Sequence, residues 1–437
     1  MIQGGASGAP SARTPEGKTM TETSQPASVP ARLPLVTVLA PFALVFALGN
    51  YFRFMNAVLA PHLVADLHLS AGDLGLLVSA YFLASALFQA PLGLMMDRYG
   101  PRRVQASMIL LGGIGALVFG AAATWPVALI GRVVMGLGAA GALMTSIQAV
   151  TLWFPTERWP FFNGIVLSVG ALGALAATLP TQFVIDLLGW RQLMVGVALA
   201  AFAGGLMLFA VVPERVAEEK PSSLGEQLRG LGEVYRDRVF WRVAPLYMTT
   251  VGSTIAFQSL WAGTWLRDVA ALDPNAVASD LLILTLMQIV AYVLNGLVAS
   301  ELNRRGVALI RIVIVGSALY VLSQTPLVLG SGVGRWVVLL GMGLLSNVNT
   351  LCYPMLSQHF PARLIGRANT ALNTFFFIGA FILQYMVGLV IDLFPSEASG
   401  GYPVLAYQLA FAVTLAAQLA SWAWLLVTPR PRSSEPS

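Results

Sequence analysis

Long apolar runs, separated by short polar stretches, make up most of the chain. Each run is long enough to cross the hydrocarbon core of a membrane, about 30 Å thick, as one helix. The twelve runs are residues 33–62, 73–96, 104–122, 126–152, 161–187, 192–212, 241–266, 277–300, 307–330, 335–357, 367–393 and 403–427. The longest polar stretch between them, residues 213–240, separates the sixth run from the seventh. The pattern predicts an all-α integral membrane protein with two six-helix bundles, residues 32–212 and 241–428, joined by a cytoplasmic linker.

The composition agrees with this interpretation. Of the 437 residues, 57% are hydrophobic and 10% are charged, whereas soluble domains are about 25% charged. The net charge of +5 is spread between the apolar runs rather than gathered in one basic domain, so we expect no nucleic-acid partner. The polar ends, residues 1–31 and 429–437, are expected to be cytoplasmic tails, the first of them disordered. The first apolar run is too long for the core of a cleavable signal peptide.

The distribution of basic residues predicts the orientation in the membrane. Three arginines, Arg98, Arg102 and Arg103, lie in the short turn between the second and third runs, which we call the basic turn (residues 93–103). With both termini cytoplasmic, twenty of the 25 Lys and Arg residues fall on the cytoplasmic side. Such an asymmetry is typical of cytoplasmic loops. We therefore expect a multi-pass protein of the inner (plasma) membrane, in contact with membrane lipid.

The two halves of the chain also repeat. Residues 206 positions apart match at Phe154-Pro155 and Phe360-Pro361, at Asn163 and Asn369, at Gly173 and Gly379, and at residues 184–187 and 390–393. Parallel six-helix repeats of this kind are known in secondary transporters, whose substrate sites lie between the halves near the membrane midplane. The repeat therefore favours pseudo-symmetric bundles with a central site.

One charge inside an apolar run suggests a binding function. Arg53 lies about two thirds of the way along the first run, where a charge is costly and is a functional hypothesis by default. Its guanidinium is suited to carboxylate, nitrate or phosphate, although it could instead be a strut that bonds to backbone carbonyls. None of the twenty Asp and Glu residues falls in the middle of a run. We therefore expect an electropositive cavity that takes an anion and disfavours organic cations.

Polar and aromatic side chains recur at helical spacing on several runs, which is typical of faces that line a wet cavity or join helices to each other. We expect the following to bind substrate together with Arg53: Tyr81, Gln89, Gln148, Gln258, Trp261, Gln288, Tyr292, Asn349, Tyr353 and Asn373.

Other chemistries find little support. Cys352 is the only cysteine, and the three histidines, His62, His68 and His359, are widely separated, so we expect no disulfide, metal site or cofactor. No phosphate-binding loop and no catalytic triad can be assembled from the sequence. The chain is therefore expected not to be an enzyme.

Two motifs resemble those of a known family. Gly93, Asp97, Arg98, Gly100 and Arg102 match the G-x-x-x-D-R-x-G-x-R signature between the second and third helices of the major facilitator superfamily. Arg132 and Gly136 resemble the R-x-x-x-G motif of that family's fourth helix. The resemblance implies twelve helices, transport by alternating access, and a part for the signature residues in conformational gating. For Arg132 we favour a structural role.

Within the superfamily, the first two helices are similar to the sugar-phosphate permease group, at Arg53 to Leu63 and Ser70 to Gly75. That group pairs its first-helix arginine with a second arginine on the seventh helix. Aligning residues 60–66 with residues 262–268 places Ile255 at this position. One guanidinium balances a monoanion better than a dianionic phosphate ester, whose second charge would be desolvated without a partner.

We expect a monomeric secondary transporter that moves a small, polar, carboxylate-type anion, with a proton or an exchanged anion as the possible coupling ion. Three alternatives remain: an organophosphate/phosphate antiporter, an exporter of drugs or siderophores, and a transporter-like solute sensor. The fifth helix lacks the Gly-Pro and Gly-Gly pairs of the antiporter signature, since it carries Gly170-Ala-Leu-Gly173. This disfavours drug/proton antiport.

Overall fold

The computed structural model describes residues 35–215, 224–330, 334–396 and 401–428, together with Met1 and Gly5. Nearly all of both expected tails, and residues 216–223 of the linker, lie outside the described residues. Within the described part the chain is helical and contains no strand.

The helices follow the apolar runs closely. In the first half they are η1 (Leu35–Leu39), α2 (Ala40–Phe54), α3 (Asn56–Leu67), α4 (Ala71–Gly120), α5 (Trp125–Ala139), α6 (Ala142–Trp153), η2 (Thr156–Arg158), α7 (Trp159–Ala176), α8 (Leu179–Leu188) and α9 (Trp190–Val211). In the second half they are α10 (Leu224–Arg236), α11 (Arg238–Ala256), η3 (Phe257–Trp261), α12 (Ala262–Asp268), α13 (Pro274–Arg304), α14 (Leu309–Ser323), α15 (Thr325–Leu329), α16 (Arg335–Leu345), η5 (Ser346–Leu351), α17 (Cys352–His359), α18 (Ala362–Ile391) and α19 (Val404–Val427).

Among the described residues, ten helical segments are long and apolar enough to span a membrane. The count is consistent with twelve crossings for two reasons. First, α4 contains both the second and the third expected runs and changes direction at Gly100, where φ is 75° and ψ is 162°. Such a positive φ is readily adopted only by glycine, so the sharp turn expected there is present. Second, the seventh run forms α11, η3 and α12, which are rich in Thr, Ser and Gln and fall outside the ten.

Several runs expected as continuous helices are interrupted. The fifth run breaks at Thr178 (φ −105°, ψ −120°) and the ninth at Gln324, each two residues before a proline. The tenth contains the 3₁₀ segment η5, where Ser346, Asn347 and Thr350 are close together. Proline removes a backbone donor, and short polar side chains compete for backbone hydrogen bonds. These local effects account for the breaks.

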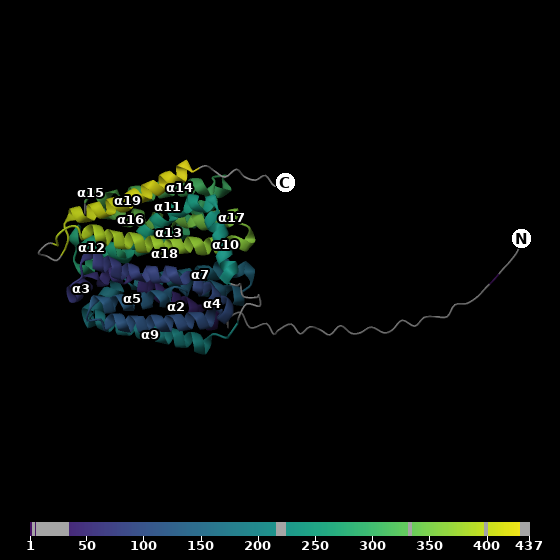
Figure 1. The fold of residues 1–437 in the computed structure, drawn as a ribbon, viewed down its shortest axis with the longest axis horizontal. Coiled ribbons are helices and arrows are strands. Elements are labelled where there is room, and N and C mark those ends of the chain that lie inside the picture. Colours follow the sequence, from purple (N-terminus) through teal and green to yellow (C-terminus); the bar gives the residue numbers. More distant parts are fainter. Residues whose placement is uncertain (2–4, 6–34, 216–223, 331–333, 397–400, 429–437) are drawn as a thin grey trace.

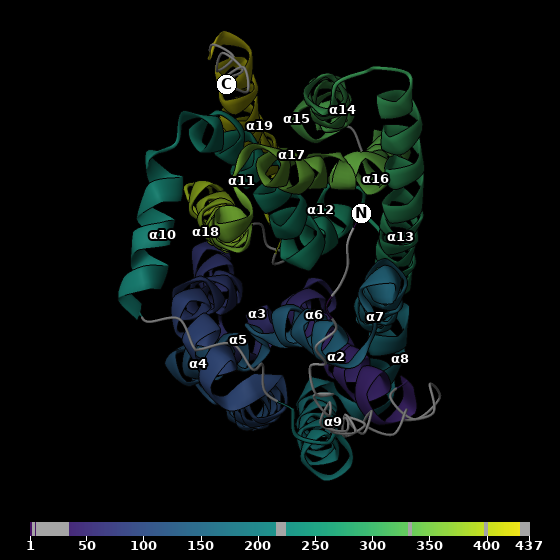
Figure 2. The ribbon, with the colours of Figure 1, turned by 90° about the vertical axis from the view of Figure 1, so that its right-hand side faces the viewer.

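The linker carries a helix that the apolar pattern did not predict. In α10, Glu233 pairs with Arg363 at the start of α18, with 2.9 Å between the charged groups. Asp237 then caps α11 by accepting hydrogen bonds from Val239 and Phe240. Figure 2 shows α10 along one side of the molecule, beside α18.

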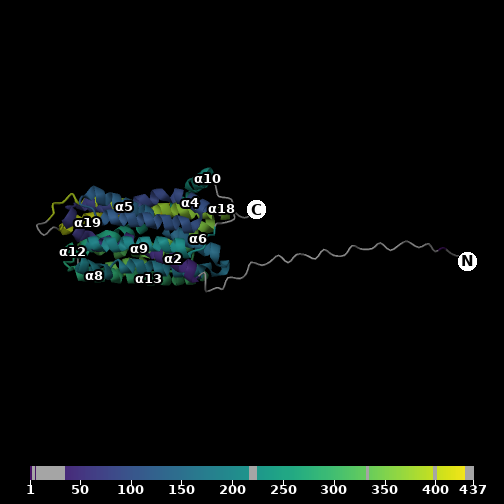
Figure 3. The ribbon, with the colours of Figure 1, turned by 90° about the horizontal axis from the view of Figure 1, so that it is seen from below.

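The helices form two groups. In Figure 2, α2 to α9 occupy the lower part and α11 to α19 the upper part. Between the groups, α4 packs against α18, and α7 and α8 pack against α13. Figures 1 and 3 show that most helices run along one common direction, and Figure 1 shows that α10 and the carboxy-terminal end of α19 lie at the same end of the molecule. We call this the α10 end, and the opposite one the Asp392 end.

The halves are joined tightly at the Asp392 end. The Asp392 carboxylate accepts hydrogen bonds from the Ser70 hydroxyl (2.7 Å) and from the backbone N–H groups of Ala71 and Gly72 (2.8 Å each). Tyr402 donates its hydroxyl to the same carboxylate, at 3.2 Å. A carboxylate at a helix N-terminus satisfies free N–H groups and complements the helix dipole. Asp392 therefore fastens the start of α4 to the carboxy-terminal half.

From this end the first part of α4 and α18 run antiparallel, side by side. The pairs that meet are Ser70 with Asp392, Gly75 with Gly388, and Gln89 with Asn373. The middle pair brings backbone close to backbone, because a Cβ on Gly75 would lie 3.4 Å from the Cα of Gly388. We call this line of contacts the α4–α18 seam.

Packing is looser toward the α10 end. In α13, Val277, Ala278, Leu281 and Leu284 of the first turns are buried. Beyond Gln288 most side chains are exposed, including three consecutive ones at 292–294, which cover more than half of the helix circumference. The second half of α13 is therefore less covered by protein than its first turns, although Asn295 still donates to the Leu344 carbonyl in α16 at 3.0 Å, and the halves are joined at the Asp392 end.

The internal repeat is visible in the packing. A Cβ on Gly173 of α7 would collide with the backbone of Ala47 in α2, and a Cβ on Gly379 of α18 would collide with the backbone of Met248 in α11. The two glycines therefore allow the same close helix contact in each half.

Candidate functional site

Arg53 lies where the first run changes course. It is in the last turn of α2, and Met55 separates α2 from α3. The Asn56 side chain donates to the Arg53 carbonyl at 3.3 Å, a local bond of the type that competes with helix continuity. The half-buried Arg53 side chain therefore lies next to the break between α2 and α3 rather than in the middle of a regular helix.

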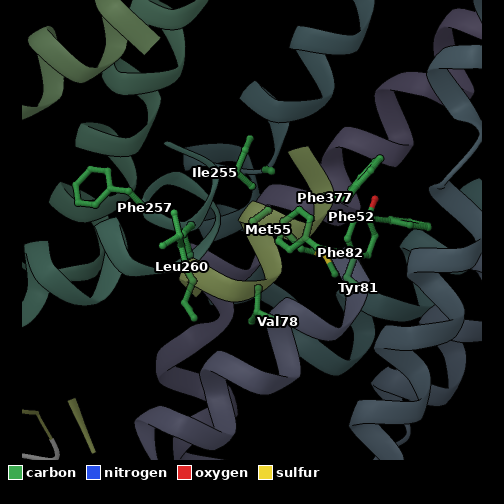
Figure 4. Packing of buried hydrophobic residues seen from close by; sticks show 14 of the residues in the cluster. Phe52, Met55, Val78, Tyr81, Phe82, Ile255, Phe257, Leu260 and Phe377 are labelled. Carbon is green, nitrogen blue, oxygen red and sulfur yellow. The ribbon is translucent and has the colours of Figure 1, made fainter. Parts of the chain in front are cut away.

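The Arg53 guanidinium faces the other half of the molecule. Its Cζ lies 5.4 Å and 5.8 Å from the ring centroids of Phe376 and Phe377 in α18, and 5.9 Å from that of Phe54. Such distances allow cation–π attraction. Figure 4 shows Phe377 close to Phe52 and Met55 of the amino-terminal half. Arg53 therefore crosses the interface between the halves.

The surroundings of Arg53 are aromatic rather than acidic. Its guanidinium lies beside the Tyr81 hydroxyl, and its charge acts on the hydroxyl of Tyr292 in α13. Its Nε is buried and has no hydrogen-bond partner within the described residues. In that same part of the chain no carboxylate pairs with Arg53; the ion pairs there lie near helix ends and in the polar connections. The site is electropositive.

A second arginine supports the backbone around Arg53. Arg132 of α5 has no exposed surface and donates to the Phe52 carbonyl at 3.1 Å. Its Cζ lies 5.0 Å from the Tyr81 ring centroid, and the Tyr81 hydroxyl donates to the Gly49 carbonyl at 3.1 Å. The two side chains contact α2 at positions shortly before Arg53, and the structural role of Arg132 stays a prediction.

The position that aligns with Arg53 in the second half is apolar. Ile255 of α11 is 7% exposed and belongs to the same hydrophobic cluster as Phe52, Phe82 and Phe377 (Figure 4). Among the described residues, the amino-terminal half contributes the charge at this level of the site.

Three expected binding residues of the second half lie on α13 and α17. Tyr292 is 57% exposed, although many protein atoms surround it, so its side chain borders an open space. Tyr353 is half-buried and accepts a hydrogen bond from Tyr247. Gln288 is half-buried, and its backbone carbonyl accepts from Asn347.

Other expected binding residues have structural contacts. Gln89 and Asn373 bond to each other across the halves, with 3.1 Å between side-chain oxygen and nitrogen. Asn349 has no exposed surface and accepts from Ser317 inside the second half. Gln148 is half-buried, and its Oε1 has no partner among the described residues.

Two residues of the seventh run pack near the Asp392 end. Trp261 donates to the Gln384 carbonyl at 2.9 Å and packs on Gly75 of the other half. Gln258 donates to Thr285 at 3.3 Å. Their side chains contribute to the closed side rather than to the surroundings of Arg53.

The basic turn contacts its own half. Arg102 donates to Glu214 at 3.1 Å and to the Phe209 carbonyl, and Arg103 donates to Glu214 at 3.0 Å. Arg98 lies over the ring of its neighbour Tyr99. Asp97 and Gly93 are half-buried, and Asp97 has an interaction partner of its own. The gating roles of these residues stay predictions.

Sequence reasoning missed three features of the site. Tyr247 lies three residues before Thr250, on the polar face of the seventh run, and that spacing is a signal that could have identified it. Phe376 and Phe377 belong to the carboxy-terminal half, and no local sequence pattern links them to Arg53. The contacts of Asp392 with Ser70 to Gly72 depend on how the halves meet, which no local pattern predicts.

An apolar groove lies elsewhere, between α2, α7 and α9. It is lined by Leu44, Leu48, Tyr51, Val169, Leu172 and Met207 among others. Because its walls are almost entirely apolar, it suits lipid chains and not a polar solute.

Comparison with known proteins places these observations in a family. The profile of the Major Facilitator Superfamily matches residues 42–384. The chain is 23% identical over 378 residues to the probable sulfoacetate transporter SauU of Cupriavidus necator, covering 81% of this chain and 87% of that protein. It is 25% identical over 227 residues to the nitrite extrusion protein of Bacillus subtilis, an alignment that covers 51% of this chain and 55% of that relative.

Solved structures share the fold. A bacterial homologue of the human lysosomal transporter Spinster, in an inward-facing and occupied conformation, superposes with a TM-score of 0.74 at 17% identity, covering 90% of this chain and 97% of that one. A D-xylose-proton symporter superposes with a TM-score of 0.69 at 15% identity, covering 92% of this chain and 99% of that one. The profile match covers more than half of the chain, and we conclude that it belongs to the major facilitator superfamily of membrane transporters.

Proposed function

We propose that this transporter moves a small, polar organic anion of the carboxylate or sulfonate type by alternating access, and that Arg53 binds the anion. The observation that carries the proposal is the Arg53 guanidinium at the interface of the halves, bordered by aromatic rings and without a carboxylate partner among the described residues. A cation left uncompensated in a membrane interior is costly. A solute anion removes that cost when it binds.

Two relatives support an anionic solute. The names of the SauU protein and the nitrite extrusion protein each refer to an anion. Nitrite is a monoanion and sulfoacetate a dianion, and each offers an oxyanion group that a planar guanidinium can bind through two parallel hydrogen bonds.

The organophosphate alternative is less well supported. It requires more positive charge at the solute, but the position that aligns with Arg53 in the second half is Ile255, and Arg132 is covered by Tyr81 and has no exposed surface. A dianionic phosphate ester would therefore carry one charge without a contacting partner.

The proposed localisation is the inner membrane, with both termini cytoplasmic. The support is the excess of arginine at the α10 end, which carries the basic turn and the linker. The Asp392 end would then face outward, and the structure would correspond to a state closed to the outside. We further propose that the protein acts as a monomer and that a proton or an exchanged anion couples transport.

Flux measurements in proteoliposomes test the proposed function. Purified protein should transport small carboxylates or sulfonates, and Arg53→Ala should raise the apparent Kd by roughly 30-fold or more, because truncating one partner of a buried charge pair costs about 2–5 kcal/mol. Arg53→Lys should recover little, since the planar fork is lost. Arg311→Ala, which removes an exposed arginine of α14, is the matched control and should transport normally. Wild-type flux in a folded Arg53→Ala variant would rule out Arg53 as the anion anchor.

A further inference from the structure

Opposite Arg53, the carboxy-terminal half contributes three tyrosines that come together from separate helices. Tyr247 of α11 donates its hydroxyl to that of Tyr353 in α17 at 3.2 Å, and their rings meet edge to face with centroids 5.6 Å apart. Tyr292 of α13 lies close enough for its hydroxyl to interact electrostatically with both of them. We call Tyr247, Tyr292 and Tyr353 the tyrosine cluster.

The hydrogen-bond directions leave donors available in this cluster. Tyr247 is 3% exposed, and its hydroxyl donates its hydrogen bond to the Tyr353 hydroxyl. Tyr353 accepts that bond and is half-buried, so its own proton can be donated outward. Tyr292 is 57% exposed, and within the described residues its hydroxyl has no hydrogen-bond partner. Two phenolic O–H groups of the cluster are therefore free to donate to a solute.

The cluster and Arg53 belong to one site. The Tyr292 hydroxyl in α13 lies within electrostatic range of the Arg53 guanidinium in α2, on the other half. The second half of α13, which carries Tyr292, has mostly exposed side chains, so protein atoms leave the Tyr292 side chain accessible.

The two sides of this site differ in charge. Arg53 and, behind Tyr81, Arg132 place all the positive charge in the amino-terminal half. In the described part of the carboxy-terminal half, the arginines lie at helix ends, as in the pairs of Arg267 with Asp268 and of Arg335 with Asp280. Phenolic hydroxyls donate hydrogen bonds but do not neutralise a charge. A second anionic group here would lack a counter-charge.

We propose that the solute is a monoanion with two polar ends: an oxyanion bound by Arg53 and an uncharged oxygen, such as a hydroxyl or carbonyl, bound by Tyr292 and Tyr353. This inference rests on the proposed function, because it assigns the second end of the same solute. It makes the two tyrosines the residues that select among small anions.

Three sulfonates of similar size test this assignment, since their sulfonate charge does not change near neutral pH. Ethanesulfonate has no second polar group, 2-hydroxyethanesulfonate has a hydroxyl, and sulfoacetate has a second anionic group. In proteoliposomes with the full-length protein, the hydroxyl compound should have the lowest apparent Kd. One neutral hydrogen bond accounts for about a 3- to 10-fold preference over ethanesulfonate.

The double variant Tyr292→Phe with Tyr353→Phe keeps both rings and removes both hydroxyls. It should lose the preference for 2-hydroxyethanesulfonate and keep the wild-type affinity for ethanesulfonate, which also shows that it is folded. Tyr385→Phe, on α18, removes a hydroxyl outside the cluster and should keep the preference.

The outcomes separate the two proposals. If none of the three sulfonates and no small carboxylate binds to or is transported by the folded wild type, the anion function itself fails, and the assignment of the tyrosines fails with it. If the anions are transported but the wild type does not prefer the hydroxyl compound, or the double variant retains that preference, only the tyrosine assignment is overturned. Tighter binding of sulfoacetate than of the hydroxyl compound would also overturn it, because that result requires a second positive group.

Discussion

Arg132 carries a charge with no exposed surface and few partners. One nitrogen donates to the Phe52 carbonyl, while Nε and Nη2 have no hydrogen-bond partner within the described residues. Burying a charge without full compensation costs stability. We therefore expect that Arg132 serves to fix the position of α2, which carries Arg53 one residue after Phe52.

The substitution Arg132→Met tests this balance. We expect an unchanged or higher melting temperature, because methionine fills the space without a buried charge, together with roughly a 2- to 10-fold loss of anion affinity from misalignment of Arg53. Thermal unfolding and flux of the same preparation measure both quantities. A strongly lowered melting temperature would show that Arg132 stabilises the fold rather than the site.

At the residue scale the sequence predicts part of the site. Arg53 could be identified because a charge in an apolar run is unusual, and the lack of mid-run Asp and Glu is read directly from the chain. The rings that surround it come from Phe376 and Phe377, more than 300 positions away. Contacts of this kind depend on how the halves pack, and single-sequence patterns do not contain that information.

At the scale of helices, close packing through glycine repeats in both halves. Gly173→Ala and Gly379→Ala should each lower the stability by about 1–3 kcal/mol, because the added methyl group collides with the backbone of a neighbouring helix. Melting temperatures of the detergent-solubilised protein measure this effect.

Two other glycines on α7 and α18 provide matched controls. A Cβ on Gly164 or Gly366 would meet nothing within 4 Å, so alanine there should be neutral or slightly stabilising through the unfolded state. Equal melting temperatures for all four variants would contradict the interpretation that Gly173 and Gly379 are close-packing positions.

Helix positions are predicted well from the apolar runs because length and hydrophobicity alone decide whether a segment can span a membrane. The interruptions of these helices are not predicted by the apolar runs. The breaks at Met55, Thr178 and Gln324 depend on local competition for backbone hydrogen bonds, and α10 is a polar helix stabilised by its contacts with α18.

At the scale of the whole molecule, Asp392 holds one end closed. Asp392→Asn keeps the shape of the side chain and removes its charge, and charge-assisted hydrogen bonds are about twice as strong as neutral ones. We expect the variant to shift the population toward states that are open at the Asp392 end, by about tenfold for each 1.4 kcal/mol lost.

Spin labels at Leu188→Cys and Asn275→Cys, at the Asp392 end of each half, can measure this opening as a longer distance. Cys352 is buried and should not react. Asp186→Asn is the matched control, because Asp186 is the repeat counterpart of Asp392 but bonds to Gln182 of its own half at 2.7 Å. An identical distance distribution in both variants would remove Asp392 from the closing mechanism.

The α4–α18 seam has a further consequence for how the halves move. Its charged and glycine contacts lie at one end, while the amides of Gln89 and Asn373 meet further along it. If the Gln89–Asn373 contact persists when the Asp392 hydrogen bonds break, α4 and α18 would rotate about that contact. Separation of the two helices at the Asp392 end would then bring them closer together at the α10 end. A single pair of neutral side chains would then be enough to prevent a continuous leak through the protein.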